Sequence, residues 1–150
     1  MIFNRTIEDV LAAISIRAEK VQKGIELTES DVTALERGTL TINTLNRIEN
    51  KQAELKEILV DMGYGVGDIS NSVWDFLGLF KQEDFDRILT NEQKLKDAFF
   101  IYSDTPNVSS NNYRLFSVIN EVEKILADFE TMINDVKSNY RICGVAVCGE

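Results

Sequence analysis

The chain has 150 residues, with 25 acidic and 16 basic side chains, a formal net charge of −9 and no histidine. This length suits one domain with its own core, and the negative charge disfavours binding to nucleic acid or to an anionic membrane surface. Without histidine, the chain lacks the commonest general base and the commonest metal ligand. No apolar run is long enough to span a bilayer, and the polar N-terminus gives no sign of a secretory signal.

The N-terminal segment has the pattern of a capped amphipathic helix. Thr6 and Asp9 form a capping signature, because the hydroxyl accepts a backbone N–H and the acid suits the positive end of the helix. Gly24 is expected to mark the far end. We expect its apolar row to pack against other helices; the row recurs at intervals of four and three residues and consists of Ile7, Leu11, Ile14, Ala18, Val21 and Ile25.

A second, short helix is predicted after Thr28 and Asp31, which repeat the capping signature, and Gly38 is expected to close it. A third helix is expected over residues 42–62. Its seam combines four apolar residues with one polar residue and consists of Leu45, Ile48, Gln52, Leu55 and Leu59. A polar residue in such a seam can set the register of helix pairing.

Three glycines in residues 63–67 predict a break after the third helix. The aromatic stretch 73–80 reads as a short helix or a turn-like plug. A fourth helix is expected over 83–102, with Thr90-Asn91 as a candidate break because both residues favour caps. A polar loop over 103–112 contains the only proline.

The last helix has the clearest pattern, with two adjacent apolar rows at three-four spacing over about 26 residues. The rows consist of Leu115, Val118, Val122, Ile125, Phe129, Met132 and Val136, and of Ile119, Leu126, Ile133 and Tyr140. This period predicts left-handed, coiled-coil-like packing, and the width of the stripe predicts at least two neighbouring helices. We favour packing inside one chain over a subunit interface.

The predicted fold is therefore a mainly α bundle of about four to five helices in one domain, residues 1–139, followed by a short extended tail, residues 140–150. The tail is small and β-prone, so it could add a strand to a neighbouring chain or fray as a loose terminus. Its two cysteines, Cys143 and Cys148, are expected to be free thiols, because two thiolates without histidine cannot complete a zinc site.

Acidic residues are plentiful but are expected to lie on solvated helix faces, opposite the apolar seams. They include Glu8, Asp9, Glu54, Glu57, Glu83, Asp84, Asp86, Glu121 and Glu123. Glu92 lies at a core-like position, where we favour local exposure near a helix break. No nucleophile–base or metal-ligand set is present, so we expect neither an enzyme nor a cofactor site.

Candidate residues for subunit contacts come from the aromatic stretch, the last helix and the tail. They are Trp74, Phe76, Phe80, Leu115, Val118, Val122, Val145, Val147 and Cys148. Large aromatics suit both cores and interface anchors, so Trp74 has two readings that the sequence leaves open.

Several short segments, in order, resemble a family of small proteins encoded among the tail and baseplate genes of phages and prophages of Gram-positive bacteria. The family has an opening R-T-x-x-D-V, a D-L-N-R-I-E-N signature, an N-x-I-E-K-x-L core in its final helix and a Y-R-x-x-G-E … G-E ending. The segments that carry the resemblance are Asn4-Arg5-Thr6 with Asp9-Val10, Thr44 to Asn50, Met62-Gly63-Tyr64 with Trp74, Arg87-Ile88 with Asn91, Leu95 and Phe99, Thr105-Pro106, Asn120 to Leu126, and Tyr140-Arg141 with Cys148-Gly149-Glu150. The chain departs from the pattern at Gly144-Val145, where the family has Gly-Glu.

The resemblance implies a non-enzymatic virion protein of the distal tail, in the baseplate, tail tip or tail fibre, assembled in the host cytoplasm. The partners it implies are other phage tail proteins, with a homo-oligomer, such as a trimer by analogy with tail-tip symmetry. Two alternatives stay open: a tail-assembly chaperone or adaptor, and a small helical module that binds a host protein. As for the motif residues, we expect Thr6 to cap its helix and Arg47 and Glu49 to pair across helices.

Overall fold

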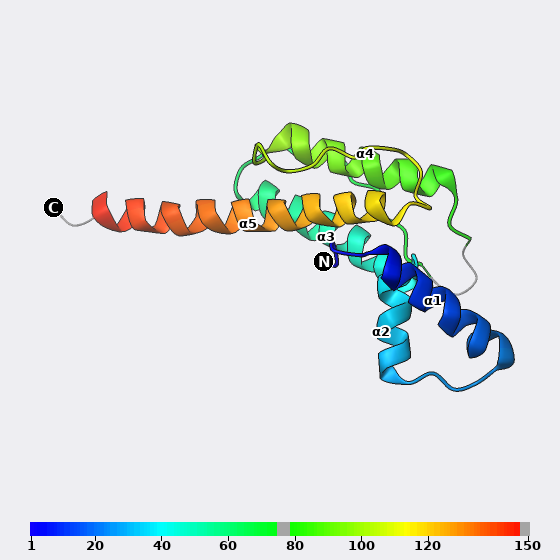
Figure 1. Cartoon of the computed structure of the whole chain (residues 1–150). Coiled ribbons are helices and arrows are strands. Elements are labelled where there is room, and N and C mark those ends of the chain that lie inside the picture. Colours follow the sequence, from blue (N-terminus) through cyan, green and yellow to red (C-terminus); the bar gives the residue numbers. More distant parts are fainter. Residues whose placement is uncertain (75–78, 148–150) are drawn as a thin grey trace.

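The computed structural model describes the backbone of residues 1–74 and 79–147, and the side chains of residues 1–74 and 79–139. The helices are α1 (Ile7–Glu19), α2 (Glu29–Gly38), α3 (Ile42–Asp61), α4 (Gln82–Ala98) and α5 (Phe116–Val147), with a 3-10 turn, η1 (Val21–Lys23), after α1 (Figure 1). Every regular element in these ranges is helical, which confirms the predicted mainly α fold.

Both predicted capping boxes are present at the starts of α1 and α2. The Thr6 hydroxyl accepts the Asp9 N–H at 3.3 Å, and the Asp9 carboxylate accepts the Thr6 N–H at 2.8 Å. Thr28 and Asp31 make the same reciprocal pair at 3.2 and 2.8 Å. Each box satisfies two backbone donors that a helix start otherwise leaves free, so these short helices begin where the sequence predicted.

Helices α1 and α2 pack closely against each other and form an arm, residues 7–38, beside the rest of the chain (Figure 1). Gly38 closes α2 as predicted, but it also has a packing role. A Cβ atom placed on Gly38 would lie 2.1 Å from the Asp9 carbonyl oxygen and 2.4 Å from the Ala13 Cβ. Only glycine therefore lets the end of α2 approach α1 at this distance.

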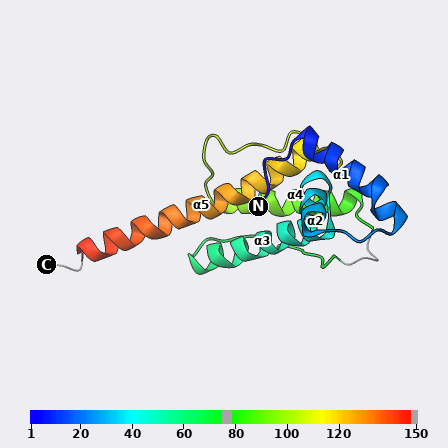
Figure 2. The ribbon, with the colours of Figure 1, turned by 60° about the horizontal axis from the view of Figure 1, so that its bottom comes forward.

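Helices α3, α4 and α5 form a bundle around a continuous apolar core (Figures 1 and 2). Most of the two predicted rows of α5 lies in this core, from Val118 to Ile133, together with the seam of α3 and the inner face of α4, whereas Leu115 at the start of the first row is exposed. The fully buried apolar side chains include Ile48, Leu55, Leu59, Phe85, Ile88, Leu95, Val122, Ile125, Leu126 and Phe129. The long helix is thus the internal spine of the bundle, as we favoured from its wide apolar stripe.

Helix α5 continues to Val147, which corrects the prediction of an extended segment from residue 140. Beyond Pro106 the chain has no proline to stop a helix, and the single interior glycine, Gly144, costs only about 1 kcal/mol relative to alanine. Elongation of an existing helix adds one hydrogen bond per residue without a new nucleation step. The C-terminal part of α5 extends past α3 and α4 in both views (Figures 1 and 2). Residues 148–150 lie outside the described chain.

Helix α4 differs from its prediction in two respects. It is uninterrupted across Thr90-Asn91, and it ends at Ala98 rather than near residue 102. Phe99 leaves the helix in an extended conformation and packs edge-on against Tyr64, with ring centroids 4.8 Å apart. The burial of Phe99 and its contact with Tyr64 favour the end of the helix here over one further turn.

The apolar row of α1 points away from the core, which corrects the prediction that it packs against other helices. Ile7, Leu11 and Ile14 are 51%, 58% and 55% exposed. Ala13, one position before Ile14, is instead fully buried against the end of α2. The helix carries apolar residues on two faces, and the arm uses the other face.

Candidate functional site

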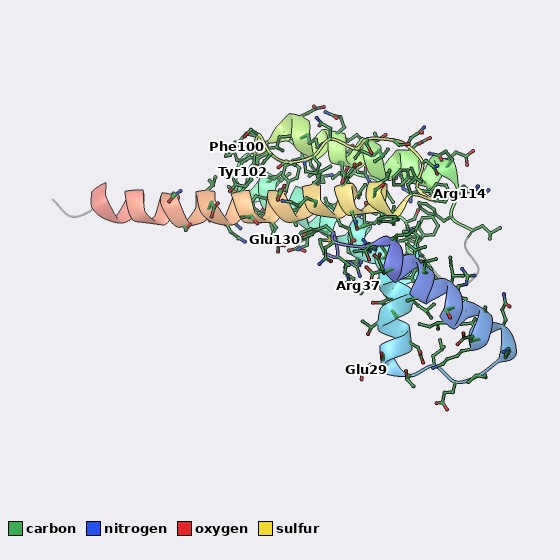
Figure 3. The ribbon with its side chains drawn as sticks, viewed as in Figure 1. Glu29, Arg37, Phe100, Tyr102, Arg114 and Glu130 are labelled. Atoms are coloured by element: carbon green, nitrogen blue, oxygen red, sulfur yellow. The ribbon has the colours of Figure 1, made fainter. Side chains whose placement is uncertain are left out.

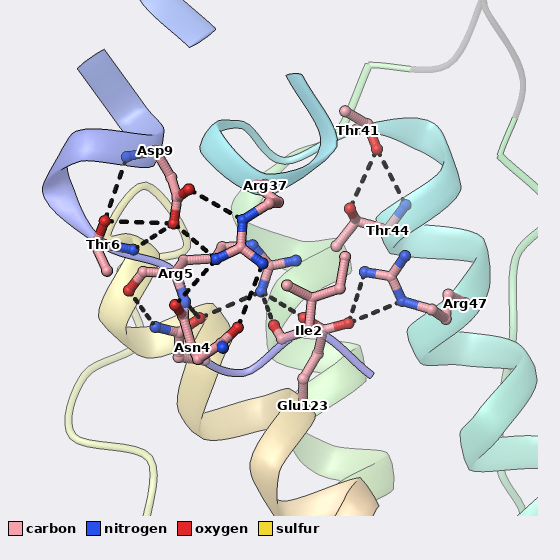
Figure 4. Close-up of polar contacts among 11 residues, drawn as sticks. Ile2, Asn4, Arg5, Thr6, Asp9, Arg37, Thr41, Thr44, Arg47 and Glu123 are labelled. Carbon is pink, nitrogen blue, oxygen red and sulfur yellow. Dashed lines mark hydrogen bonds and ion pairs between the residues drawn. The ribbon is translucent and has the colours of Figure 1, made fainter. Parts of the chain in front are cut away.

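Glu123 on α5 is a fully buried carboxylate held between two arginines (Figure 4). Arg47 on α3 donates to Oε1 from Nε at 2.9 Å and from Nη2 at 2.7 Å, while Arg5 donates from Nη1 to Oε2. The two arginines and one carboxylate leave a net charge of +1. Because a buried carboxylate is costly unless it is paired, these two contacts offset the cost of burying the Glu123 charge.

Asn120 attaches the N-terminal segment to α5 one turn before Glu123. The Arg5 N–H donates to Asn120 Oδ1 at 3.2 Å, and Asn120 Nδ2 donates to the Arg5 carbonyl at 3.0 Å. The amide thus replaces the partners that a neighbouring strand would supply. Arg5 is thereby fixed through both its backbone and its side chain, so the segment that leads into α1 is tied to the bundle.

Glu49 on α3 is the centre of a second buried network. Its Oε1 accepts Nη2 of Arg87 on α4 at 2.5 Å and the Trp74 indole N–H at 3.1 Å. The Arg87 guanidinium lies 5.7 Å from the centre of the Trp74 ring, in cation–π contact. Burial works to lower the Arg87 pKa, but the bonds and charge of Glu49, with a smaller share from Asp84, raise it. Arg87 therefore stays a cation.

The predicted pairing of Arg47 and Glu49 across helices is confirmed, since Arg47 reaches α5 and Glu49 reaches α4. Asn46 adds a third contact, with its amide accepting the Trp74 N–H at 2.9 Å and donating to the Trp74 carbonyl at 3.1 Å. The polar residues of the signature motif thus hold neighbouring segments together, which is a structural use of the motif.

Gln52, the polar residue in the α3 seam, is fully buried and bonded to α4. Its Nε2 donates to the Ile88 carbonyl at 2.9 Å, and its Oε1 accepts Asn91 Nδ2 at 3.2 Å. Asn91 also exchanges hydrogen bonds with the Ser70 backbone at 2.9 and 3.3 Å. These bonds fix the register between α3 and α4, and they use the amide of Asn91, a residue of the predicted helix break.

Glu92 is buried, against the prediction of local exposure, and its Oε1 has no hydrogen-bond partner in the part of the chain described. Burial raises the pKa of Glu92 well above its ordinary value of 4.5, and the charge of Lys96 offsets this only in part. A carboxyl in such a place is neutral at pH values where an exposed glutamate is ionised. Glu123 is likewise buried, which corrects its expected place on a solvated helix face.

Ion pairs hold the arm together, and Arg37 also donates a hydrogen bond to the Asn4 carbonyl of the N-terminal segment at 3.4 Å. Arg37 on α2 donates to Asp9 on α1 at 3.0 and 3.1 Å, and this pairing lowers the pKa of Asp9. Lys20 donates to Asp31 at 2.6 Å, and with the bonds from Thr28 it lowers the Asp31 pKa from 3.8 to about 2. Both carboxylates are ionised at neutral pH.

The exposed apolar row of α1, here called the outer stripe, consists of Ile7, Leu11 and Ile14. The residues are spaced i, i+4 and i+7, so they lie on one face of the helix over two turns. Val21 and Ile25, beyond the end of α1, are also about half exposed. This spacing is the one with which an amphipathic helix anchors itself in a groove of a partner.

The predicted contact residues fall into four groups: buried, half-buried, exposed and not described. Val118 and Val122 are fully buried in the chain's own core, and Trp74 is only 9% exposed, which corrects their assignment to a subunit interface and gives Trp74 its core reading. Phe80 is half-buried against Trp74 and Tyr113.

Leu115 is exposed and remains open to a partner. Val145 and Val147 belong to the helical end of α5, where side chains are not described, and Phe76 and Cys148 lie outside the described residues.

No group of three or more potential metal ligands occurs among the described residues, and none of the described helices has the length and apolar character needed to cross a membrane. Comparison with protein-family models, with curated proteins and with solved structures finds no match to this chain.

Proposed function

We propose that this chain is a non-enzymatic structural subunit of a phage tail, at the distal end of the tail, and that it binds other tail proteins through the outer stripe. The observation that carries the proposal is the exposure of Ile7, Leu11 and Ile14 on one face of a well-anchored helix. Three exposed apolar side chains on one helix face favour a contact with a partner over exposure to water.

Two further features support an assembly role. The charged residues of the motifs serve the chain's own fold, since Glu49 pairs with Arg87 and Glu123 pairs with Arg5 and Arg47. The C-terminal part of α5 projects beyond the other helices, so it is free to meet a neighbouring subunit (Figure 2). The resemblance to tail and baseplate proteins then supplies the kind of assembly.

The experiment is protein mass spectrometry of particles purified from an induced lysogen that encodes the chain. A structural subunit is expected in intact particles at a fixed ratio to the known tail proteins. Presence in the lysate with absence from intact particles would contradict the proposal and would favour an assembly chaperone. Recovery of only a host protein in a pull-down would favour a host-directed module instead.

A further inference from the structure

A half-open cavity of about 370 Å³ lies where the arm meets the bundle. Its walls come from the N-terminal segment, α1, the end of α2, the segments before α4 and α5, and the start of α5. They consist of Arg5, Val10, Gly38, Thr39, Leu40, Phe80, Tyr113, Arg114, Phe116 and Ile119. A volume of this order suits a small organic molecule.

The two charged residues of the wall are both arginines, although the whole chain carries a charge of −9. Arg5 is only 5% exposed, and its Nη2 has no hydrogen-bond partner among the described residues. Glu123 does not cancel the local charge, because it is shared by Arg5 and Arg47. A buried guanidinium donor without a partner is costly, and a bound anion would satisfy it.

Arg114 adds a second cation on the exposed side of the cavity. Its guanidinium lies 5.8 Å from the centre of the Tyr113 ring, and Figure 3 shows the residue at the end of the bundle next to the arm, opposite Phe100 and Tyr102. Helix α5 begins at Phe116, on the same wall, so the positive end of its dipole also faces this region.

The rest of the wall is mainly apolar and aromatic, with Val10, Leu40, Phe80, Tyr113 and Ile119 among its members. One buried free donor and one exposed guanidinium suit a single negative charge better than a phosphate dianion, which would require more donors. We propose that the cavity binds a carboxylate attached to a small apolar or aromatic body, with the carboxylate on Arg5 and Arg114. This proposal does not rest on the assembly role of the outer stripe.

The carboxylate can come from a free small acid or from the C-terminal residue of a polypeptide. Calorimetric titration of the full chain with N-acetyl-phenylalanine, with its neutral amide and with a tripeptide that ends in phenylalanine tests both sources. The acid is expected to bind about tenfold more tightly than the amide, because only the acid can form a charge-assisted hydrogen bond with an arginine. Tighter binding of the tripeptide than of N-acetyl-phenylalanine would identify the C-terminus of a polypeptide as the ligand. Equal or weaker binding of the tripeptide would identify a free small acid, and both results support the carboxylate site.

Two variants locate the site. Arg114→Gln is expected to weaken binding of the acid about tenfold and to leave binding of the amide unchanged. Val10→Trp, which fills the cavity, is expected to abolish binding of both. Arg17→Gln removes a charge elsewhere on α1 and serves as the matched control. Circular dichroism checks that each variant is folded.

Nuclear magnetic resonance of the wild-type chain keeps the proposal testable if the filled variant does not fold. The acid is expected to shift the Ile119 methyl and Tyr113 ring signals and to leave the Ile14 methyl signals unchanged. Four results would each overturn the proposal. They are equal binding of the acid and the amide, undiminished binding of the acid by Arg114→Gln, signal shifts confined to Ile14, and no binding at all.

Discussion

Arg47 on α3 and Glu123 on α5 are 76 residues apart in the sequence and form a forked ion pair, with two nitrogens of the arginine 2.9 and 2.7 Å from one carboxylate oxygen. Arg5 occupies the other oxygen, so one carboxylate joins the N-terminal segment to two helices of the bundle (Figure 4). The arm and the bundle are therefore coupled through Glu123.

Replacement of Glu123 by alanine is expected to destabilise the chain by about 3–5 kcal/mol, because it leaves the buried Arg5 and the partly exposed Arg47 without their shared partner. Urea denaturation measures the change. The control is Glu130→Ala, which removes an exposed carboxylate of α5 that pairs with Lys51, and which is expected to cost at most about 1 kcal/mol. Equal losses in the two variants would contradict the structural role of Glu123.

Gly38→Ala is expected to loosen the arm, because the new Cβ would overlap the Asp9 carbonyl oxygen and the Ala13 side chain. Such overpacking costs about 1–3 kcal/mol. Hydrogen exchange is expected to become faster in α1 and to stay unchanged in α5. Gly65→Ala is the matched control, since a Cβ there meets nothing within 4 Å and the variant is expected to be as stable as the wild type or slightly more stable.

Glu92→Gln is expected to change how stability depends on pH. In the folded chain Glu92 retains its proton above pH 4.5, whereas in the unfolded chain it loses this proton near pH 4.5. Unfolding above this pH therefore releases a proton, and the stability of the wild type falls as the pH rises. The slope is about 1.4 kcal/mol per pH unit until the pH reaches the raised pKa.

The Gln variant lacks this slope, so its stability relative to the wild type should increase between pH 5 and pH 7. Denaturation at several pH values measures it. Glu57→Gln, at an exposed position of α3, provides the comparison. A constant difference between wild type and Glu92→Gln over this range would show that Glu92 is ionised in the fold.

Trp74 is the only tryptophan, and it is buried against Phe80 with Arg87 over its ring. Its fluorescence is expected to be quenched by acrylamide several-fold less efficiently in the folded chain than in the urea-unfolded chain. Equal quenching in the two states would place the indole in solvent and would return Trp74 to the interface candidates.

The caps and the spine of the bundle were predictable because their signals are local. Thr6 with Asp9 and Thr28 with Asp31 need only a spacing of three residues, and the double row of α5 repeats over about 26 residues. The end of α4 was not predictable, because Phe99 leaves the helix for a contact with Tyr64, 35 positions earlier.

The candidate site was less accessible to sequence reasoning for the same reason. The burial of Glu123 depends on arginines that are distant in the chain, and the cavity combines residues from distant parts of the sequence, from Arg5 to Ile119. On α1, the adjacent residues Ala13 and Ile14 lie on two different apolar faces of the helix. The Ala13 face is the buried one because Gly38 of α2 packs against it, a contact that the sequence of α1 does not contain. The exposed row was the signal for a partner surface, but its spacing equals that of a core-facing row.

Incorporation into particles tests most directly whether the outer stripe assembles the chain into a tail. A lysogen without the gene is supplied with wild type, with a Leu11→Lys and Ile14→Lys double variant, or with Ala12→Lys, which adds one charge at an exposed position off the stripe. Wild type and Ala12→Lys should be found in purified particles in equal amounts, and the folded double variant should be missing. Normal incorporation of the double variant would contradict the account.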